Sequence, residues 1–539
     1  MQLTRYSPMN GLVAAIVGTL FLLLSQAIGL SPPSESSPAD LIPSKAIPAS
    51  PEIIELGKRI YERQCAPCHG LDGRGNGEAA YLLYPKPRDF VAANYRMVST
   101  WDGVPTDSDL YFTISRGIPG SAMPSWSHLT EEERWGLVHF VKSFADYPIE
   151  APTYESVSDS GIVKIPPEPT HPPESPDYVQ QLFIQSCAPC HGVLGEGDGT
   201  KEQIDDLGFP TRPRDLTRGI YKGGPEPEQV YLRIVAGMPG SPMPSSSWAY
   251  GDDAWYLTRF VLAMSSEIQR QKAEMRKYHI AANRVDQVPE HPDDGAWRDA
   301  PGVDLHLMPL WWRDDRPEIL NVKALHDGEE IAIRLLWDDE TNDHTAIRAH
   351  EFRDAVAVQF STDADPPFFA MGERGRFINL WMWKSERQAD LEPAFQDIDK
   401  VYPNIGIDSY PNPEVSALEQ PTRQALTLES DPTFVTGWGA GNIVSNPWRP
   451  SAAEDLVAQG FGTLQALPVS DQVVQAKGAY DLGSYRVVFR RTLRGVDGES
   501  VDLMPGEKVS VAFAVWNGSA GDRDGKKSVT IWQDLELVP

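Results

Sequence analysis

The 539-residue chain contains four cysteines, and all of them lie in two copies of the sequence Cys-Ala-Pro-Cys-His-Gly, at residues 65–70 and 187–192. Each copy is followed in the same order by a Pro-Arg-Asp sequence, a Gly/Pro-rich loop that contains Met-Pro, and a segment with a tryptophan and apolar residues at helical spacing. The spacing is nearly the same in both copies, with a period of about 120 residues. This pattern predicts a duplicated domain of about 95 residues rather than a solenoid.

Two cysteines that are separated by two residues and followed directly by histidine are typical of c-type haem attachment. The thiols add to the haem vinyl groups, and the histidine becomes an axial ligand of the iron. The alternatives are a thioredoxin-like redox pair, a zinc site and two disulfides, but a zinc ribbon does not require histidine after both cysteine pairs. A redox pair is not normally doubled in a chain with no other cysteine. We therefore predict two covalent haem c groups, held by Cys65, Cys68 and His69 and by Cys187, Cys190 and His191.

The Gly/Pro-rich loops supply candidates for the second axial ligand of each iron. Thioether sulfur suits low-spin iron and raises its potential. Met123 and Met243 lie 54 and 52 residues after the histidine, and proline follows both. Met238 is a competitor in the second copy, but the first copy has Ile118 at that position. We predict Met123 and Met243 as ligands, and Met97 remains an unmatched candidate in the first copy.

The two copies resemble class I cytochrome c domains over residues 52–147 and 177–264. The resemblance rests on the CAPCH sequences and the Met-Pro loops that follow them. It implies two small helical domains that each carry one low-spin haem and transfer electrons. Arg88 and Arg214, in the Pro-Arg-Asp sequences, could bind haem propionates as forked cations; the alternative is that they are solvated surface arginines.

The formal charge of −28 limits the possible partners. So acidic a chain repels phosphate backbones, which excludes nucleic-acid binding, and it is not expected to dock on an anionic membrane face. The charge favours basic partners, such as a basic soluble electron carrier.

The first 30 residues predict export to the periplasm. Arg5 precedes an uncharged run that ends at Leu30, and its apolar centre, Leu12 to Leu24, is short for a membrane span. Small residues at Ser25 and Ala27 fit a cleavage site after Ala27. A cleaved signal peptide is favoured, and an uncleaved membrane anchor is the alternative.

A different pattern begins at about residue 301. Short segments rich in Val, Ile and aromatic residues often alternate in polarity and are separated by Gly, Asp and Pro, as in IAIRLLWDD, DAVAVQFS, FINLWMWK, YRVVFRR and KVSVAFAVWNG. This pattern predicts an all-β sandwich of about 240 residues. Composition alone leaves a carbohydrate-binding, a docking or a cofactor domain open. Residues 391–470 have few strand signals, and we expect them to wrap the sandwich or to form a partner surface.

The sandwich resembles the ethylbenzene-dehydrogenase-related haem b domain in four ordered blocks: LLWDDETND, FFAMGERGRFINLWMWKSE, YRVVFRRTL and VAFAVWNGSAGDRDGKKSVTIWQDLEL. The resemblance implies one non-covalent haem b between a methionine and a lysine. Met371 matches the methionine, and Lys527 is our choice for the lysine. Lys526 is its neighbour, and alternation along a strand places the two on opposite faces, so only one can reach an internal haem.

The predicted fold is two small all-α cytochrome c domains followed by an all-β sandwich. The order is a signal peptide or anchor (1–30), a Ser/Pro-rich linker (31–51), a first cytochrome c domain (52–148), a Pro-rich linker (149–176), a second cytochrome c domain (177–270), a linker (271–300) and the haem b domain (301–539).

Domains like the third occur in γ subunits of molybdenum enzymes related to dimethyl sulfide dehydrogenase and nitrite oxidoreductase, beside an iron–sulfur subunit and a molybdopterin subunit. The resemblance therefore implies a periplasmic electron relay between such partners and a soluble cytochrome or terminal oxidase, without catalysis by this chain. The alternatives are a dihaem cytochrome with a docking sandwich that holds no haem, and a dihaem peroxidase-like enzyme.

Overall fold

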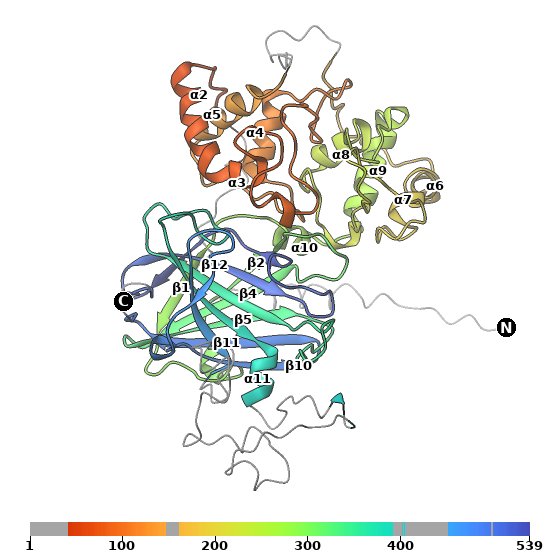
Figure 1. The fold of residues 1–539 in the computed structure, drawn as a ribbon. Coiled ribbons are helices and arrows are strands. Elements are labelled where there is room, and N and C mark those ends of the chain that lie inside the picture. The colour runs from red at the N-terminus through yellow and green to blue at the C-terminus, as the bar shows by residue number, and fades with distance from the viewer. Residues whose placement is uncertain are drawn as a thin grey trace, which may run out of the picture. The chain divides into compact units, whose positions relative to one another are not determined.

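The computed structural model describes residues 41, 43–146, 161–391, 401–402, 404, 451–496 and 500–539 (Figure 1). The predicted signal peptide or anchor lies outside this part of the chain, and so does most of the segment 391–470. Within the described residues, no helix is both long enough and apolar enough to cross a membrane.

The first helical group contains the first CAPCH sequence. Its main helices are α2 (Pro51–Ile60), η2 (Tyr61–Cys65), α3 (Ala66–His69), α4 (Asp107–Arg116) and α5 (Glu131–Lys142). Ser50 caps α2 through its side chain ahead of the proline at the first helical position. Thr130 and Glu133 form a capping box at the start of α5. The group has its own hydrophobic cluster, in which Tyr61 and Val138 are fully buried.

Helices α2 and α5 cross where two glycines face each other. A Cβ atom added at Gly57 would lie 2.0 Å from the backbone oxygen of Gly136. The two helices therefore pack backbone against backbone at this point, and the crossing has no room for a side chain.

Replacing Gly57 by alanine is expected to destabilise the first helical group by about 1–3 kcal/mol, because the added methyl group must push two backbones apart. Urea-induced unfolding of the full chain measures this loss. Gly295→Ala is a matched control, since no atom lies within 4 Å of a Cβ at that position. Equal stability of the Gly57 variant and the unaltered protein would contradict the close crossing.

The second helical group contains the second CAPCH sequence and repeats this arrangement. Its helices are α6 (Pro176–Ser186), α7 (Ala188–His191), α8 (Pro227–Val235), α9 (Asp252–Leu262) and the following α10 (Glu267–Lys272). In the first group Tyr111 packs against Trp135 with ring centroids 4.8 Å apart, and Tyr231 and Trp255 pair in the second group at 5.0 Å. The two groups thus share both their helix order and an aromatic contact between the last two helices of the motif.

Part of the predicted Pro-rich linker 149–176 is packed against the protein. Residues 161–174 are described, and Val163 is buried there. The backbone N–H of Val163 donates to the backbone oxygen of Ser99 in the first group at 2.8 Å. The indole N–H of Trp255 in the second group donates to the backbone oxygen of Pro166 at 2.9 Å. This half of the segment therefore contacts both helical groups instead of acting as a free spacer.

The C-terminal region forms one 14-stranded sheet with the order β10-β11-β5-β4-β1-β14-β12-β6-β7-β8-β9, while β2 pairs with β4, and β13 pairs with β12 and β3. The strands are β1 (His279–Arg284), β2 (Gly302–His306), β3 (Met308–Pro309), β4 (Ile319–His326), β5 (Glu330–Asp338), β6 (Ala355–Ser361), β7 (Ile378–Lys384), β8 (Ala453–Ala458), β9 (Gln465–Ala466), β10 (Gln475–Asp481), β11 (Ser484–Thr492), β12 (Lys508–Trp516), β13 (Ser528–Val529) and β14 (Gln533–Leu537). A short helix, α11 (Ser385–Leu391), follows β7.

The sheet folds over on itself, so that its two halves share one hydrophobic core. Trp337 of β5 and Phe489 of β11 come from one half, Val358 of β6 and Trp381 of β7 come from the other, and all four belong to one buried cluster. The predicted sandwich is thus a large β-sheet domain built from one continuous sheet.

One boundary in our prediction is wrong. We assigned residues 271–300 to a linker, but β1 lies there and pairs in parallel with both β14 and β4. Only Ile280 and Ala282 of its six residues, HIAANR, are buried, so the segment looks polar in the sequence. Its place in the middle of the sheet depends on partners that are distant in the chain.

Candidate functional site

The first helical group contains a cavity with about 1,430 Å³ of space that no atom fills, part of it open to solvent. Cys65, Cys68, His69 and Met123 all line this cavity. His69 is buried, and its Nδ1 lies 3.1 Å from the backbone oxygen of Arg88. When the Nδ1–H group donates a hydrogen bond to this oxygen, the Nε2 atom carries the free lone pair that can bind a metal. Burial lowers the pKa of His69 to about 4, which keeps the ring neutral.

The second helical group contains a cavity of the same kind, with about 1,230 Å³ of space that no atom fills, part of it open to solvent. Cys187, Cys190, His191 and Met243 line it. The Nδ1 atom of His191 lies 3.1 Å from the backbone oxygen of Arg214. Burial lowers the pKa of His191 as well. Each cavity therefore brings two thiols, a neutral imidazole and a thioether to one place, and this donor set fits a covalently attached haem.

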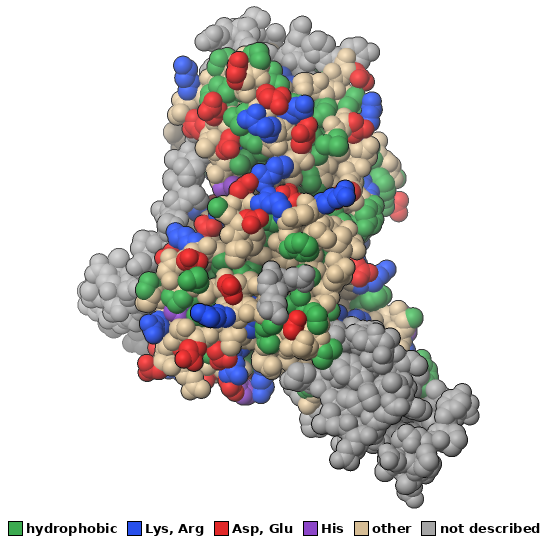
Figure 2. All heavy atoms as spheres, turned by 60° about the vertical axis from the view of Figure 1, so that its left-hand side comes forward, with side chains coloured by type: hydrophobic (Ala, Val, Ile, Leu, Met, Phe, Trp, Pro, Cys, Tyr) green, Lys and Arg blue, Asp and Glu red, His purple; other side chains and the backbone are tan. Residues whose placement is uncertain are grey.

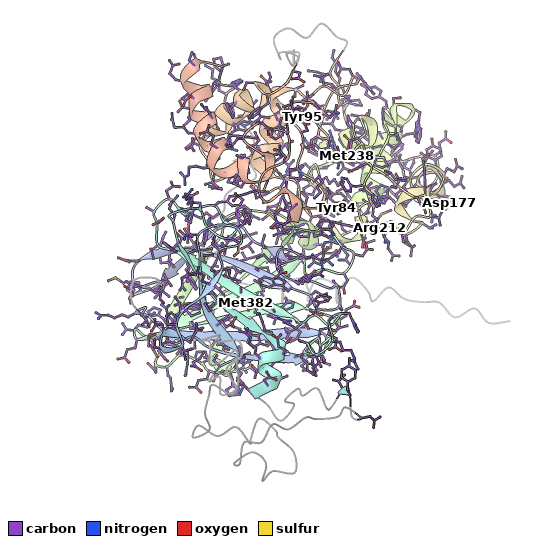
Figure 3. All side chains as sticks on the ribbon, in the orientation of Figure 1. Tyr84, Tyr95, Asp177, Arg212, Met238 and Met382 are labelled. Carbon is purple, nitrogen blue, oxygen red and sulfur yellow. The ribbon has the colours of Figure 1, made fainter. Side chains whose placement is uncertain are left out.

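The two methionine loops have the same internal hydrogen bond. The backbone N–H five residues before the methionine donates to the methionine's own backbone oxygen, at 3.0 Å for Met123 and 3.1 Å for Met243. In the second loop this donor is Met238, which lies in the second helical group (Figure 3) and also lines the cavity, five residues before Met243. Met97 lines the first cavity, with its sulfur 3.9 Å from the guanidinium of Arg233. The hydrogen bonds thus make Met243 the equivalent of Met123.

The arginines of the two Pro-Arg-Asp sequences reach across into the opposite copy. Arg88 lines the first cavity and forms an ion pair with Asp206 of the second group at 3.1 Å. Arg214 lines both cavities and donates to the backbone oxygens of Pro119 and Gly120, both at 2.8 Å, in the Met123 loop. Neither arginine is a freely solvated surface residue, and both face a cavity.

Lys222 is a residue that the sequence analysis missed. It lines both cavities, and no ion pair joins it to a carboxylate among the described residues. Burial and the nearby Arg214 lower its pKa to about 7, and burial lowers the pKa of Arg214 to about 9. Desolvated cations beside a cavity fit an anionic ligand such as a carboxylate. A signal was present in the duplication, because Tyr95-Arg96 and Tyr221-Lys222 begin seven residues after the Pro-Arg-Asp arginine in both copies.

The β-sheet domain brings Met371 and Lys527 together from segments 156 residues apart. The Lys527 amine nitrogen lies 3.9 Å from the Met371 sulfur and 4.8 Å from the centre of the Trp516 ring. Met371 has a φ of 75°, which is uncommon for a residue with a side chain. Burial lowers the pKa of Lys527 to about 8, which favours the neutral amine, the form that can bind iron. An amine beside a thioether, with no carboxylate ion pair among the described residues, fits the two axial positions of a haem iron.

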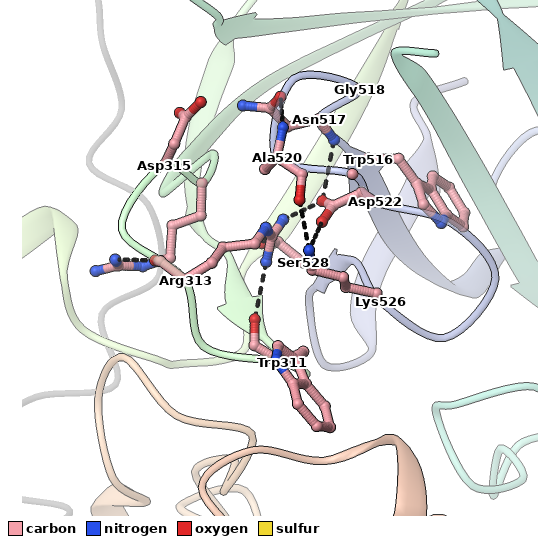
Figure 4. A network of polar contacts seen from close by, with 12 residues as sticks. Trp311, Arg313, Asp315, Trp516, Asn517, Gly518, Ala520, Asp522, Lys526 and Ser528 are labelled. Atoms are coloured by element: carbon pink, nitrogen blue, oxygen red, sulfur yellow. Dashed lines mark hydrogen bonds and ion pairs between the residues drawn. The ribbon is translucent and has the colours of Figure 1, made fainter. Parts of the chain in front are cut away.

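The neighbouring lysine, Lys526, has different partners. The Lys526 amine donates to the backbone oxygen of Ala520 and lies 4.0 Å from Asp522, which also forms a buried ion pair with Arg313 (Figure 4). The amine of Lys526 is thus engaged by Ala520 and Asp522, whereas the amine of Lys527 lies beside Met371. The geometry therefore separates the two candidates, with Lys527 beside the methionine. Both lysines precede β13, so alternation along a strand does not account for the separation.

Comparison with known families identifies two parts of the chain. The family model of ethylbenzene dehydrogenase matches residues 294–528, and the model of cbb3-type cytochrome c oxidase subunit III matches residues 53–141. The chain carries an ethylbenzene dehydrogenase domain and a cytochrome c domain. The first is the β-sheet domain that contains Met371 and Lys527, and the second is the first helical group.

Curated relatives match nearly half of this chain. A protein named as a respiratory nitrate reductase haem subunit of Haloferax mediterranei is 26% identical over 259 residues, which cover 47% of this chain and 69% of the relative. The γ subunit of dimethylsulfide dehydrogenase from Rhodovulum sulfidophilum is 26% identical over 264 residues, 47% of this chain and 77% of the relative. The γ subunit of chlorate reductase from Ideonella dechloratans is 21% identical over 253 residues, 45% of this chain and 77% of the relative. The resemblance seen in the sequence is confirmed, and this chain is related to γ and haem subunits of oxidoreductases.

Proposed function

We propose that this chain is the electron-transfer subunit of a periplasmic oxidoreductase complex and carries two covalent haem c groups and one non-covalent haem b. One observation carries the proposal: three separate places each bring one nitrogen donor and one methionine sulfur together. The pairs are His69 with Met123, His191 with Met243, and Lys527 with Met371. The second helical group is then a second cytochrome c domain, with Arg88, Arg214 and the newly found Lys222 beside the haem propionates.

Two protein ligands at each iron leave no position for a substrate. When bound, the haem groups supply one-electron oxidation and reduction. The residues of the chain hold the irons, keep both histidines in the metal-binding tautomer and place desolvated cations beside the two cavities. Substrate chemistry therefore belongs to a partner. The two alternative functions fit less well. A peroxidase-like enzyme would need one of these ligands to leave its iron. A docking sandwich without haem would give the Met371–Lys527 pair no role.

The relatives indicate the kind of partner. By analogy with the γ subunits of dimethylsulfide dehydrogenase and chlorate reductase, we infer a molybdopterin and an iron–sulfur subunit on one side of the relay. A soluble cytochrome or a terminal oxidase is on the other side. Acidic and basic side chains are interspersed on the face drawn in Figure 2. The formal charge of −28 attracts a basic carrier, and added salt screens this attraction.

The haem inventory tests this proposal. The full chain is produced in a periplasm that attaches haem c, and a pyridine haemochrome spectrum then counts both haem types. We expect two haem c and one haem b per chain, all low-spin. Folded protein with two haem c and no haem b would make the sheet domain a docking module, and a high-spin haem would favour the enzyme alternative.

A further inference from the structure

We propose that the first helical group is the direct electron-transfer neighbour of the Met371–Lys527 site, so that the first CAPCH site lies between the second one and the sheet domain. This inference rests on the proposed function and adds the order of its three sites. In this proposal, the rings of Phe368 and Phe369 form the contact through which electrons pass between the first cavity and the haem b site.

The sheet domain forms part of the wall of the first cavity. Phe368 and Phe369, three and two residues before Met371, line this cavity together with Cys68 and His69. Their rings pack against each other with centroids 4.7 Å apart. The hydrophobic cluster that contains both rings also includes Met371 and Cys68. Apolar atoms are thus packed continuously from a haem-attachment cysteine to the methionine of the sheet domain.

A chain of backbone hydrogen bonds joins the same two places. The N–H of Tyr84, which lies in the first helical group (Figure 3), donates to the backbone oxygen of Leu310 at 2.9 Å. The N–H of Leu310 in turn donates to the backbone oxygen of Lys527 at 2.9 Å. Close packing supports this contact, because a Cβ atom at Gly525 would lie 2.6 Å from the Leu82 side chain. Two hydrogen bonds therefore connect Tyr84, which lies between the cavity-lining residues Leu83 and Pro85, to the backbone of the predicted lysine ligand, Lys527.

The second helical group contacts the sheet domain differently. Ion pairs join Arg212 to Asp314 at 2.7 Å and Arg218 to Glu318 at 3.0 Å. All the residues that line the second cavity lie between Phe183 and Val261, within the second group itself. Lys222 and Arg214, in contrast, line both helical cavities. The second cavity thus borders the first, and the first borders the sheet domain.

Electron tunnelling through packed atoms and hydrogen bonds is faster than through an empty or water-filled gap of the same length. Removing the Phe369 ring is therefore expected to slow electron transfer between haem c and haem b several-fold. The step moves one electron and neither forms nor breaks a bond, and a flavin semiquinone is the reductant in the test.

The test uses the full-length protein with all its haems. A laser flash generates the flavin semiquinone, which reduces haem c, and the haem b absorbance then reports the intramolecular step, whose rate is independent of protein concentration. Phe369→Ala should slow this step several-fold with an unchanged haem inventory. Phe461→Ala is the matched control, because Phe461 packs on Phe368 with centroids 6.3 Å apart but does not line the cavity.

The measured rates and the haem content decide the inference. An unchanged rate in Phe369→Ala would overturn it. A slower rate in the double variant Arg212→Ala/Arg218→Ala, with Phe369→Ala unaffected, would place the second group next to haem b. Phe369→Ala could be uninformative only by losing haem b. In that case Phe369→Leu, which keeps most of the apolar volume, replaces it, and electron transfer from haem c to haem b must be slower in this variant. Absence of haem b from the unaltered protein would instead refute the proposed function.

Discussion

Replacing Lys527 by alanine is expected to abolish haem b binding while both haem c groups stay attached. The proposed haem b would not be held covalently, so its retention would depend on its two proposed ligands and on the apolar packing around them. The Lys527 amine is the nitrogen donor that lies 3.9 Å from the Met371 sulfur. The two proposed haem c groups would have covalent bonds in separate cavities and would not depend on this residue. The pyridine haemochrome spectrum of the variant should show two haem c and no haem b.

Lys526→Ala is the matched control for this prediction. It removes the same charge one residue away, but its amine bonds to the backbone oxygen of Ala520 and lies beside Asp522. This variant is expected to keep haem b with an unaltered low-spin spectrum. A low-spin haem b in Lys527→Ala, or its loss in Lys526→Ala, would show that the lysine has been assigned incorrectly.

The haem c motifs could be identified from the sequence because thioether chemistry fixes residue types within five consecutive positions. Duplication then indicated Met123 and Met243 as candidate ligands, since the same loop occurs after both motifs. The strands of the sheet domain were also predictable, because IAIRLLWDD and FINLWMWK combine β-branched and aromatic residues with Gly, Asp and Pro at their ends. These segments became β5 and β7.

The contacts between the three parts of the chain could not be predicted in this way. Nothing in the sequence around Phe368 and Phe369 shows that these rings line a cavity in a helical group roughly 300 residues earlier. Lys222 lies in a glycine-rich turn, and its burial depends on how the two helical groups pack. β1 looks polar in the sequence because most of its side chains are not buried. In each case tertiary packing, and not local pattern, determines the environment.

Two buried aspartates make the stability of the sheet domain depend on pH. Asp339 and Asp354 are 4% and 0% exposed. Burial raises the pKa of both carboxyl groups, and the charge of Asp339 raises that of Asp354 further. Asp354 accepts hydrogen bonds from the backbone N–H groups of Asp343 at 2.7 Å and Gly518 at 2.8 Å, which moderate the shift without reversing it.

The sign of the effect follows from proton uptake. Above the ordinary aspartate pKa the unfolded chain releases a proton that the folded protein still holds, so the free energy of unfolding falls as the pH rises, until the raised pKa is passed. Each unit of pKa difference corresponds to about 1.4 kcal/mol. Asp354→Asn should flatten this slope, because the side chain no longer ionises. The asparagine NH2 group cannot accept a hydrogen bond, so one of the two backbone hydrogen bonds is also lost. Urea unfolding between about pH 5 and pH 8 measures the slope, and Asp481→Asn, at the exposed end of β10, is the surface control. The same slope in the Asp354 variant and in the unaltered protein would mean that this carboxyl group does not set the pH dependence.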